Sequence, residues 1–522
     1  MSAAADIAPD PAAENAALRT ENAALREQLD SVQQQLETFR KLLFGARSEK
    51  RTAVDLPGQG ELFDRPTPVA DEAPKKPVKA HGRGTAKKGF PDGCVNAQGL
   101  RFDDSVPVTT IRLEPEGIEG LSPDDYEVID TERRYRLGQS PSSYRVICYE
   151  LPVIKRRADG QILPVATVPA VLEGSVAEVS LLAGLLSDKF VSHLPLYRQH
   201  QRLEAAGVTL ARSTLTNLVR RSIDLLMPIA EAQWRHALAS KVLAMDETPI
   251  KAGRSKKTRG RMHQGYFWPI YGEDDEICFV YAGSRARRVI EELLAKEFEG
   301  TLLTDGYGAY ASFVAAEANV VHAQCWSHAR RKFVEAAEAE PVLVERMLEL
   351  FGVLYRIEAD LREAELGPEE IAERRRTLST PVVDQIVAFA AKCREDPSLL
   401  PRSPFSKALA YLENRIEALR VFLTDPAVAI DTNHLERGIR PIAMGRRNWL
   451  FCWTELGAEH VGVIQSLIST CRLHGVDPYT YLVDVLQRVG EHRASEVIEL
   501  TPRVWKERFG HAPLGSVLTG SG

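Results

Sequence analysis

The chain lacks the features that mark membrane, secreted and disulfide-bonded proteins. No run of about 18 apolar residues occurs in it, so a membrane span is not expected. Its first ten residues combine neither a basic start nor an apolar stretch, and no signal peptide is evident. The seven cysteines form no C-x-x-C pair, which favours reduced thiols and predicts a cytoplasmic protein.

An excess of positive charge is also missing. The net charge of -6 argues against a global attraction to nucleic acid, so any such attraction depends on local clusters. A hydrophobic content of 44% and a charged content of 26% are those of an ordinary globular protein. The 522 residues are enough for roughly three domains, which predicts a multidomain chain.

Residues 1–50 contain a tandem repeat that is typical of a coiled coil. The hexapeptide ENAALR stands at residues 14–19 and again at residues 21–26. Heptad positions a and d then take Leu18, Asn22, Leu25, Leu29, Val32 and Leu36. An asparagine at position a selects register and favours a parallel dimer, so we expect a homodimer or higher oligomer. The alternative is an amphipathic helix that packs within its own chain.

The next three segments differ in composition. Residues 51–100 are rich in Pro, Gly and Lys and predict a basic flexible linker. Residues 101–175 alternate β-branched and aromatic runs with turn residues, which predicts a small β-rich module. In residues 176–235, Gly207 separates two helical patterns, 194–206 and 213–226. This region suits a helix-turn-helix DNA reader, and a plain helical hairpin is the alternative.

Residues 236–333 carry the pattern of an α/β core. We expect a meander of three strands followed by alternating helices and strands, which is the order of a ribonuclease H-like sheet. The predicted strands are residues 241–245, 265–271, 277–281, 301–304 and 320–323, with helices at 285–297 and 307–316.

The pattern after this core is helical. Residues 334–428 predict an all-α insertion, residues 429–455 a core helix, and residues 456–522 a C-terminal helical segment. The fold class is therefore a multidomain α/β protein with helical additions.

Three carboxylates stand where a two-metal phosphodiester site would need them. Asp246 and Asp305 each follow a strand-like run, and Glu436 lies on a helix predicted to end at Pro441. Two strand-end aspartates and a helical glutamate can converge on divalent ions that activate water and stabilise a leaving oxygen. A helix cap or a surface ion pair is the common alternative for each acid alone. Strand alternation predicts that Glu247 points away from Asp246, so it is not assigned to this site.

Clusters of Lys and Arg flank the three acids. The negative charge of a polyanion needs to be neutralised beside its scissile bond, so we expect these clusters to bind the DNA backbone, although solvated loops are the alternative. The predicted DNA-binding residues are Lys256, Lys257, Arg259, Arg330, Arg331, Arg437, Arg440, Arg446 and Arg447.

A second metal pattern, H-x-x-C-x-x-H, is formed by His322, Cys325 and His328. Zinc binds both residue types, but this spacing is not that of a standard structural zinc site. We therefore expect a buried, hydrogen-bonded cluster that links a strand to the helix after it.

Seven motifs in colinear order cover nearly the whole chain. Through them the chain resembles bacterial transposases of the insertion sequence sixty-six family, within the wider DDE group. The motifs are LFGARSEK at 43–50, HLPLYRQ at 193–199, MDETP at 245–249, TDGYGAY at 304–310, CWSHARRKF at 325–333, NHLER at 433–437 and GVDPYTYL at 475–482.

The resemblance implies roles for the three acids and for partners. Asp246, Asp305 and Glu436 correspond to the catalytic acids that bind two Mg²⁺ ions, with Mn²⁺ as an expected substitute. Hydrolysis would free a 3′-hydroxyl at each transposon end, and this hydroxyl would attack target DNA. The family also implies terminal inverted repeats as ligand, small accessory proteins of the same element as partners, and association with the nucleoid.

Two alternatives and one departure accompany this resemblance. A catalytically idle DNA-binding protein and a ribonuclease H-like nuclease without strand transfer would share the fold. Many relatives carry a zinc module with paired cysteines after the linker, whereas this region holds only Cys94 and Cys148. A zinc site there is therefore not expected.

Overall fold

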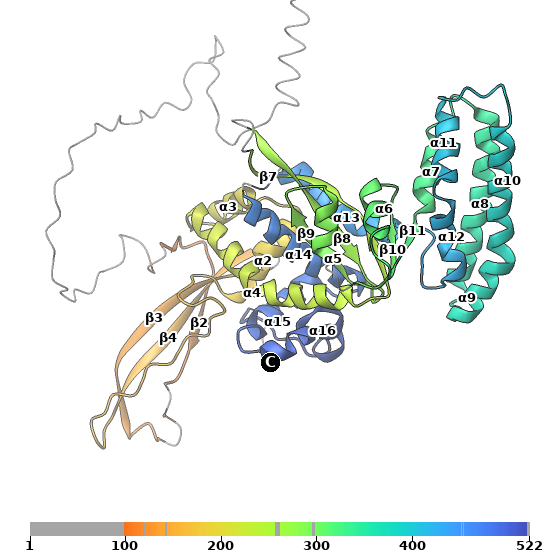
Figure 1. Ribbon diagram of the computed structural model, residues 1–522. Helices are drawn as coiled ribbons and strands as arrows, with labels where there is room; N and C mark the ends of the chain where they lie inside the picture. Colours follow the sequence, from red (N-terminus) through yellow and green to blue (C-terminus); the bar gives the residue numbers. More distant parts are fainter. Residues whose placement is uncertain are drawn as a thin grey trace, which may run out of the picture. The chain divides into compact units, whose positions relative to one another are not determined.

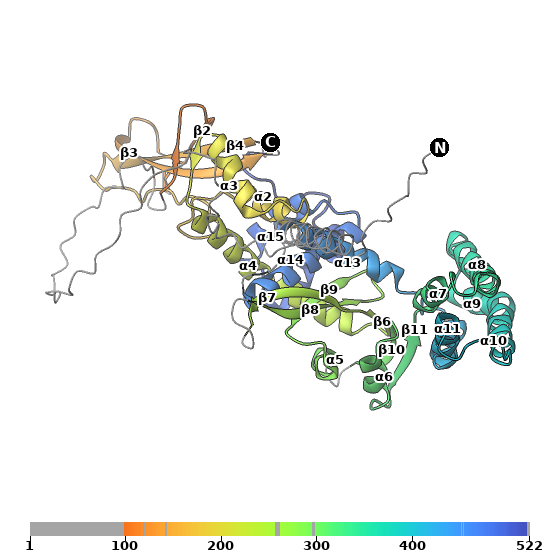
Figure 2. The same ribbon diagram turned by 90° about the horizontal axis from the view of Figure 1, so that it is seen from above.

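The computed structural model describes residue 95 and residues 99–518, apart from 116, 119–120, 141–142, 256–260, 295–297, 450–451 and 453. The predicted coiled coil of residues 1–50 lies outside the described residues, as does nearly all of the predicted linker. Lys256, Lys257 and Arg259 also lie outside them. Figures 1 and 2 show the chain as a ribbon in two views.

The first part of the described chain is a three-stranded sheet. Strand β4 (Ser143–Arg156) lies in the middle, parallel to β2 (Val108–Arg112) and antiparallel to β3 (Tyr126–Ser140). Strands β3 and β4 form the long hairpin in Figure 1. Because β4 is rich in β-branched and aromatic residues and has neighbours on both sides, most of it is buried. Strands thus lie where the β-rich pattern predicted them.

Three helices follow this sheet. Helix α2 (Val179–Phe190) is capped by the Glu178 side chain, which accepts a hydrogen bond from the amide of Ser180. Helix α3 (Leu196–Ala205) ends before Gly207, whose φ of 80° makes the turn. Strand β5 (Val208–Thr209) then pairs with β1 (Arg101–Phe102). Helix α4 (Arg212–Leu238) is far longer than the predicted helix 213–226, because its apolar positions continue to pack into the core.

The central sheet is mixed. Strand β6 is parallel to β10, which is parallel to β11, while β8 is antiparallel to β6, β7 and β9. Five strands match the predicted runs, and β7 is an additional strand that the pattern did not predict. The bounds are β6 Val242–Met245, β7 Thr248–Arg254, β8 Met262–Tyr271, β9 Ile277–Ala282, β10 Gly300–Thr304 and β11 Val320–Gln324.

Helices cover both faces of this sheet (Figure 2). Leu243 and Leu302 pack with helices α5 (Arg287–Leu294) and α6 (Gly308–Val314). Their neighbours along the strands, including Ala244, belong to the main core with the C-terminal helices. The alternation of side chains along each strand therefore separates two apolar layers.

The segment after the core is helical among the described residues. Its core contains the fully buried aromatic rings of Phe333, Phe351 and Phe405, which follow the buried Trp326. The helices are α7 Trp326–Val334, α8 Pro341–Glu363, α9 Pro368–Arg374, a π-helical turn Arg375–Ser379, α10 Thr380–Arg394, α11 Pro404–Glu413 and α12 Ile416–Thr424.

The chain then returns to the sheet through helix α13. The sequence predicted a short helix that ends at Pro441, and this prediction was wrong, because α13 runs through the proline from Asn433 to Trp449. A proline removes one backbone hydrogen bond, and here the helix resumes after it. The last elements are α14 Glu455–Leu473, α15 Pro478–Arg488, a 3-10 helix Ala494–Leu500 and α16 Pro502–Arg508.

Two further expectations can be compared with the described residues. No described helix combines the length and the apolar character needed to cross a membrane. The described cysteines are buried and free of disulfides, which agrees with the predicted reduced thiols.

Candidate active site

Two of the predicted acids meet at one edge of the central sheet. Asp246 follows β6, and Asp305 follows the neighbouring parallel strand β10, with Leu303 in register with Ala244. Because parallel strands end at the same edge, the two aspartates are brought together. One oxygen each from Asp246, Glu247 and Asp305 lies within 4.8 Å of the others.

Glu247 is an acid that the sequence pattern did not place in this site. Alternation along a continuous strand predicted that it faces away from Asp246, and this was wrong. The strand is interrupted at these two residues, since β6 ends at Met245 and β7 begins at Thr248. The period-two rule does not hold across such a break. The only local signal for the break is Pro249, which is disfavoured inside a central strand.

The Glu247 side chain is held from the side of α5 and α6. Its Oε2 accepts a hydrogen bond of 2.9 Å from the Tyr310 hydroxyl, and its Oε1 accepts one of 2.6 Å from Arg285 Nε. The Arg285 guanidinium also stacks on the Tyr307 ring, 3.9 Å from its centroid. With only 2% of its side chain exposed, Glu247 is fixed by these partners.

A tight turn holds Asp305. Its Oδ1 accepts a hydrogen bond of 2.8 Å from the amide of Tyr307, and its carbonyl accepts one of 3.0 Å from Thr304 Oγ1. The same threonine hydroxyl lies 2.9 Å from Nε2 of His322 on β11. Burial, together with the charge of Arg415, lowers the pKa of His322 to about 4, so this ring is neutral at pH 7.

Glu436 approaches the site from α13 and is half-buried. It does not join the three-oxygen group, because among the described residues that group contains Asp246, Glu247 and Asp305 only. Its Oε1 lies 3.8 Å from His328 Nε2 and 3.8 Å from a guanidinium nitrogen of Arg331.

Negative charge is concentrated at the strand ends. Burial, and then the charges of Glu247 and Asp305, raise the pKa of Asp246 from 3.8 to about 7. Burial also raises the pKa of Glu247, although the Tyr310 hydroxyl and Arg285 oppose this change. Close carboxylates with raised pKa values gain stability from a bound cation, and hard oxygen donors suit Mg²⁺ and Mn²⁺. The residues therefore fit a divalent metal site.

Cys325 and His328 interact through their side chains, but the three H-x-x-C-x-x-H residues do not form one of the groups of the described chain whose donor atoms gather as for a metal ion. His322 turns to Thr304, and His328 faces Glu436. The Cys325 sulfur accepts hydrogen bonds of 3.3 Å from the amide and hydroxyl of Thr432. His322 thus contacts β10, and Cys325 contacts the residue before α13, so these residues do more than link β11 to α7 as predicted.

The predicted DNA-binding arginines are mostly exposed on α7 and α13. Arg446 differs from them, because it is half-buried and its guanidinium donates to the carbonyl of Pro249 on β7. Arg331 lies beside Glu436. The exposed members of the set are Arg330, Arg331, Arg437, Arg440 and Arg447.

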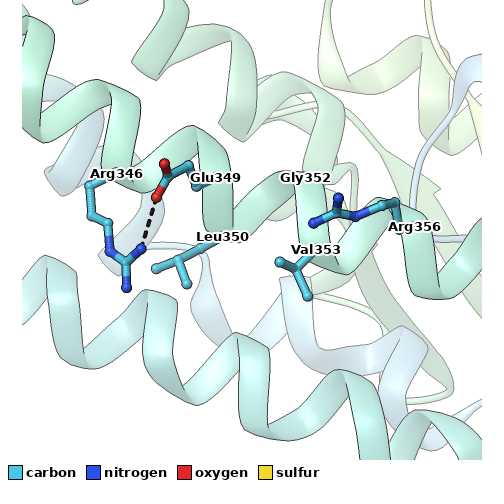
Figure 3. A pocket seen from close by; sticks show the side chains of 6 residues that line it. All are labelled: Arg346, Glu349, Leu350, Gly352, Val353 and Arg356. Carbon is cyan, nitrogen blue, oxygen red and sulfur yellow. Dashed lines mark hydrogen bonds and ion pairs between the residues drawn. The ribbon is translucent and has the colours of Figure 1, made fainter.

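Neither of two hollows in the described chain contains the acids. One, of about 620 Å³, lies on α8 between Arg346 and Arg356 over Gly352 (Figure 3). The other, of about 190 Å³, lies beside the sheet and is lined by residues that include Tyr271 and His434.

Comparison with known families defines the class of protein. The family described as "Transposase IS66 family" matches residues 174–460, which include the three predicted acids, so the chain is a transposase by class. The "IS66 C-terminal element" matches residues 466–503, which run from within α14 to the start of α16. The chain belongs to the IS66 family of transposases.

Individual relatives come from Sinorhizobium fredii. The uncharacterized protein y4hP is 32% identical over 353 residues, which are 63% of this chain and 62% of that protein. The uncharacterized protein y4jD is 28% identical over 506 residues, or 91% of this chain and 94% of the relative. The resemblance found from the sequence motifs is thereby confirmed at the level of the family.

Proposed function

We propose that this protein is a DDE-type DNA transposase. It cleaves phosphodiester bonds at transposon ends and transfers the freed 3′-hydroxyl to target DNA. The observation that carries this proposal is the meeting of Asp246 and Asp305 at the carboxyl ends of the parallel strands β6 and β10. Family membership supports the same reaction class.

The strand order supports a ribonuclease H-like core. The sheet runs from β9 through β8, β6 and β10 to β11, with the first three strands antiparallel and the last two parallel to β6. Strand β7 continues β6 after the break at Asp246 and pairs with the same neighbour, β8. This is the meander followed by parallel strands that such a core requires, and α8 to α12 form its insertion.

Asp246, Asp305 and Glu436 would hold two Mg²⁺ ions, with Mn²⁺ as a substitute. When bound, the ions would lower the pKa of water and stabilise charge on the leaving oxygen. Arg285 and Tyr310 keep Glu247 beside the aspartates, where its charge strengthens cation binding. Glu436 has His328 and Arg331 as its ionic partners among the described residues, and it would hold an ion together with the two aspartates.

The DNA partner follows from the exposed arginines. One guanidinium group can bind two oxygens of a phosphate at once. Arg330, Arg437 and Arg440 are exposed, so their guanidinium groups are accessible to such a ligand. We propose that they hold the terminal inverted repeats and the target DNA beside the acids. Dimerisation through the residue 1–50 heptads and help from small accessory proteins complete the proposal.

The test is a magnesium-dependent nicking assay on transposon-end DNA. Asp246→Asn, Asp305→Asn and Glu436→Gln should each reduce nicking by at least about a thousandfold while end-DNA binding stays within about twofold, because a lost carboxylate removes transition-state stabilisation and not the phosphate contacts. Retained nicking by Asp246→Asn would overturn the proposal. An inactive wild type that binds DNA would indicate an idle reader, and nicking without joined products would indicate a nuclease.

A further inference from the structure

The helical insertion reaches the turn that carries the second acid. Arg415, between α11 and α12, donates a hydrogen bond of 3.1 Å from Nη2 to the carbonyl of Gly306. Gly306 directly follows Asp305. An element more than a hundred residues further along the chain therefore holds the backbone next to an acid of the proposed site.

The Tyr411 ring packs directly against Gly306 in the same turn. A Cβ atom at position 306 would overlap its ring, with Cε2 and Cζ only 2.8 Å away. The Arg415 guanidinium stacks on this ring, 4.0 Å from the centroid, and Nη1 donates to the Tyr411 carbonyl at 3.3 Å. The Tyr411 ring and the Arg415 guanidinium therefore pack on each other, and both contact Gly306.

Arg415 is not explained by ordinary ion pairing. Among the described residues it forms no ion pair with a carboxylate, and its buried Nε has no hydrogen-bond partner. A half-buried, unpaired guanidinium costs stability, so its position calls for another role. Its positive charge is close enough to lower the pKa of His322, which lies behind the Asp305 turn.

We propose that Arg415 and Tyr411 are positioning residues that fix Asp305 for metal binding. The inference rests on the proposed function, since it concerns one of its acids. The insertion is then part of the active site and not only a separate module. Residues that orient a metal ligand typically change metal affinity by about 10- to 100-fold when they are altered.

The experiment measures Mn²⁺ binding by calorimetry in the full chain, beside nicking and thermal melting. Arg415→Gln and Gly306→Ala should weaken Mn²⁺ binding about tenfold. Arg415→Lys should recover part of the loss, because it keeps the charge but not the forked donors. The matched control is Arg356→Gln, an exposed arginine of the same insertion, which should leave Mn²⁺ affinity unchanged.

A double variant separates positioning from damage to the fold. Tyr411→Ala makes room for a methyl group, so Gly306→Ala with Tyr411→Ala should bind Mn²⁺ more tightly than Gly306→Ala alone. Wild-type affinity in both Arg415→Gln and Gly306→Ala would overturn the inference, as would a wild type that binds no Mn²⁺. Failure of the proposed function shows differently, as a wild type that binds Mn²⁺ and end DNA but does not nick.

Discussion

At the residue scale, the cluster of Asp246, Glu247 and Asp305 destabilises the metal-free fold and suits a functional role. Three carboxylates share a small volume, and only Glu247 has a direct cationic partner, Arg285. Like charges at such distances repel, and burial removes the water that would weaken the repulsion. The cluster therefore costs free energy in the metal-free chain, which is a common feature of catalytic sites.

This cost gives a pH-dependent prediction for Asp246. With its pKa raised from 3.8 to about 7, the folded chain holds a proton in this range that the unfolded chain has released. The free energy of unfolding contributed by Asp246 is thus highest below about pH 4 and is lost as pH rises toward about 7. Asp246→Asn should therefore stabilise the metal-free protein at pH 8 by about 1–2 kcal/mol, after allowance for partial exposure.

Chemical denaturation in a chelator measures this effect. The stabilising difference between Asp246→Asn and wild type should shrink as pH falls and approach zero at about pH 3, below the ordinary pKa of 3.8, where Asp246 is mostly neutral in both folded and unfolded chains. A difference of the same size at both pH values would show that amide packing, and not charge, is responsible.

At the element scale, the position of α13 depends on close packing. Gly438 lies two residues after Glu436 on the same helix, and a Cβ at this glycine would overlap Cδ1 of Ile277 on β9. A larger residue would push the helix from the sheet and move Glu436 away from the aspartates. Gly438→Ala should therefore destabilise the protein by about 1–3 kcal/mol and reduce nicking.

The matched partner for this change is Ile277→Val, which deletes the overlapping methyl group. Alone it should cost about 0.5–1.5 kcal/mol. Combined with Gly438→Ala it should restore part of both stability and nicking, because the alanine methyl then fills the space. Strictly additive losses in urea denaturation would contradict this packing account.

Helices and strands with strong apolar periodicity were predictable from the sequence. Breaks and extensions of these elements were not. The apolar runs of β6, β8, β9, β10 and β11 located the core and the two strand-end aspartates. Strand β7 was missed because its charged and small residues resemble a loop, yet pairing with β8 stabilises it. Tertiary packing likewise extended α4 and carried α13 through Pro441. Local propensity cannot reveal partners that are distant in sequence.

The site was predictable to the same extent. Asp246 and Asp305 followed from their places at strand ends, whereas the place of Glu247 depended on the break between β6 and β7. The contact of Arg415 with Gly306 joins residues 109 positions apart, and no motif signals it.

At the scale of the whole described chain, the C-terminal element connects parts that are distant in sequence. Asp484 on α15 is fully buried and accepts hydrogen bonds from Trp505 Nε1 at 2.8 Å and from the amide of Leu514 at 2.6 Å. Further on, the amide of Val517 donates to Glu178 at the start of α2, at 3.4 Å. One carboxylate thus fixes α16 and the tail that returns toward the first helices.

Removal of the Asp484 carboxylate should lower the free energy of unfolding of the whole described chain. Asp484→Ala removes the ionic partner of Arg488 and leaves the buried Trp505 N–H without its acceptor, so we expect a loss of about 3–5 kcal/mol in the free energy of unfolding. The matched control is Glu349→Ala, which also deletes the carboxylate partner of an arginine on its own helix. There the pair with Arg346 is exposed by 57% and 60%, so the loss should stay within about 1 kcal/mol. Equal losses in the two variants, measured by urea denaturation, would mean that Asp484 does not hold the C-terminal element to the rest of the chain.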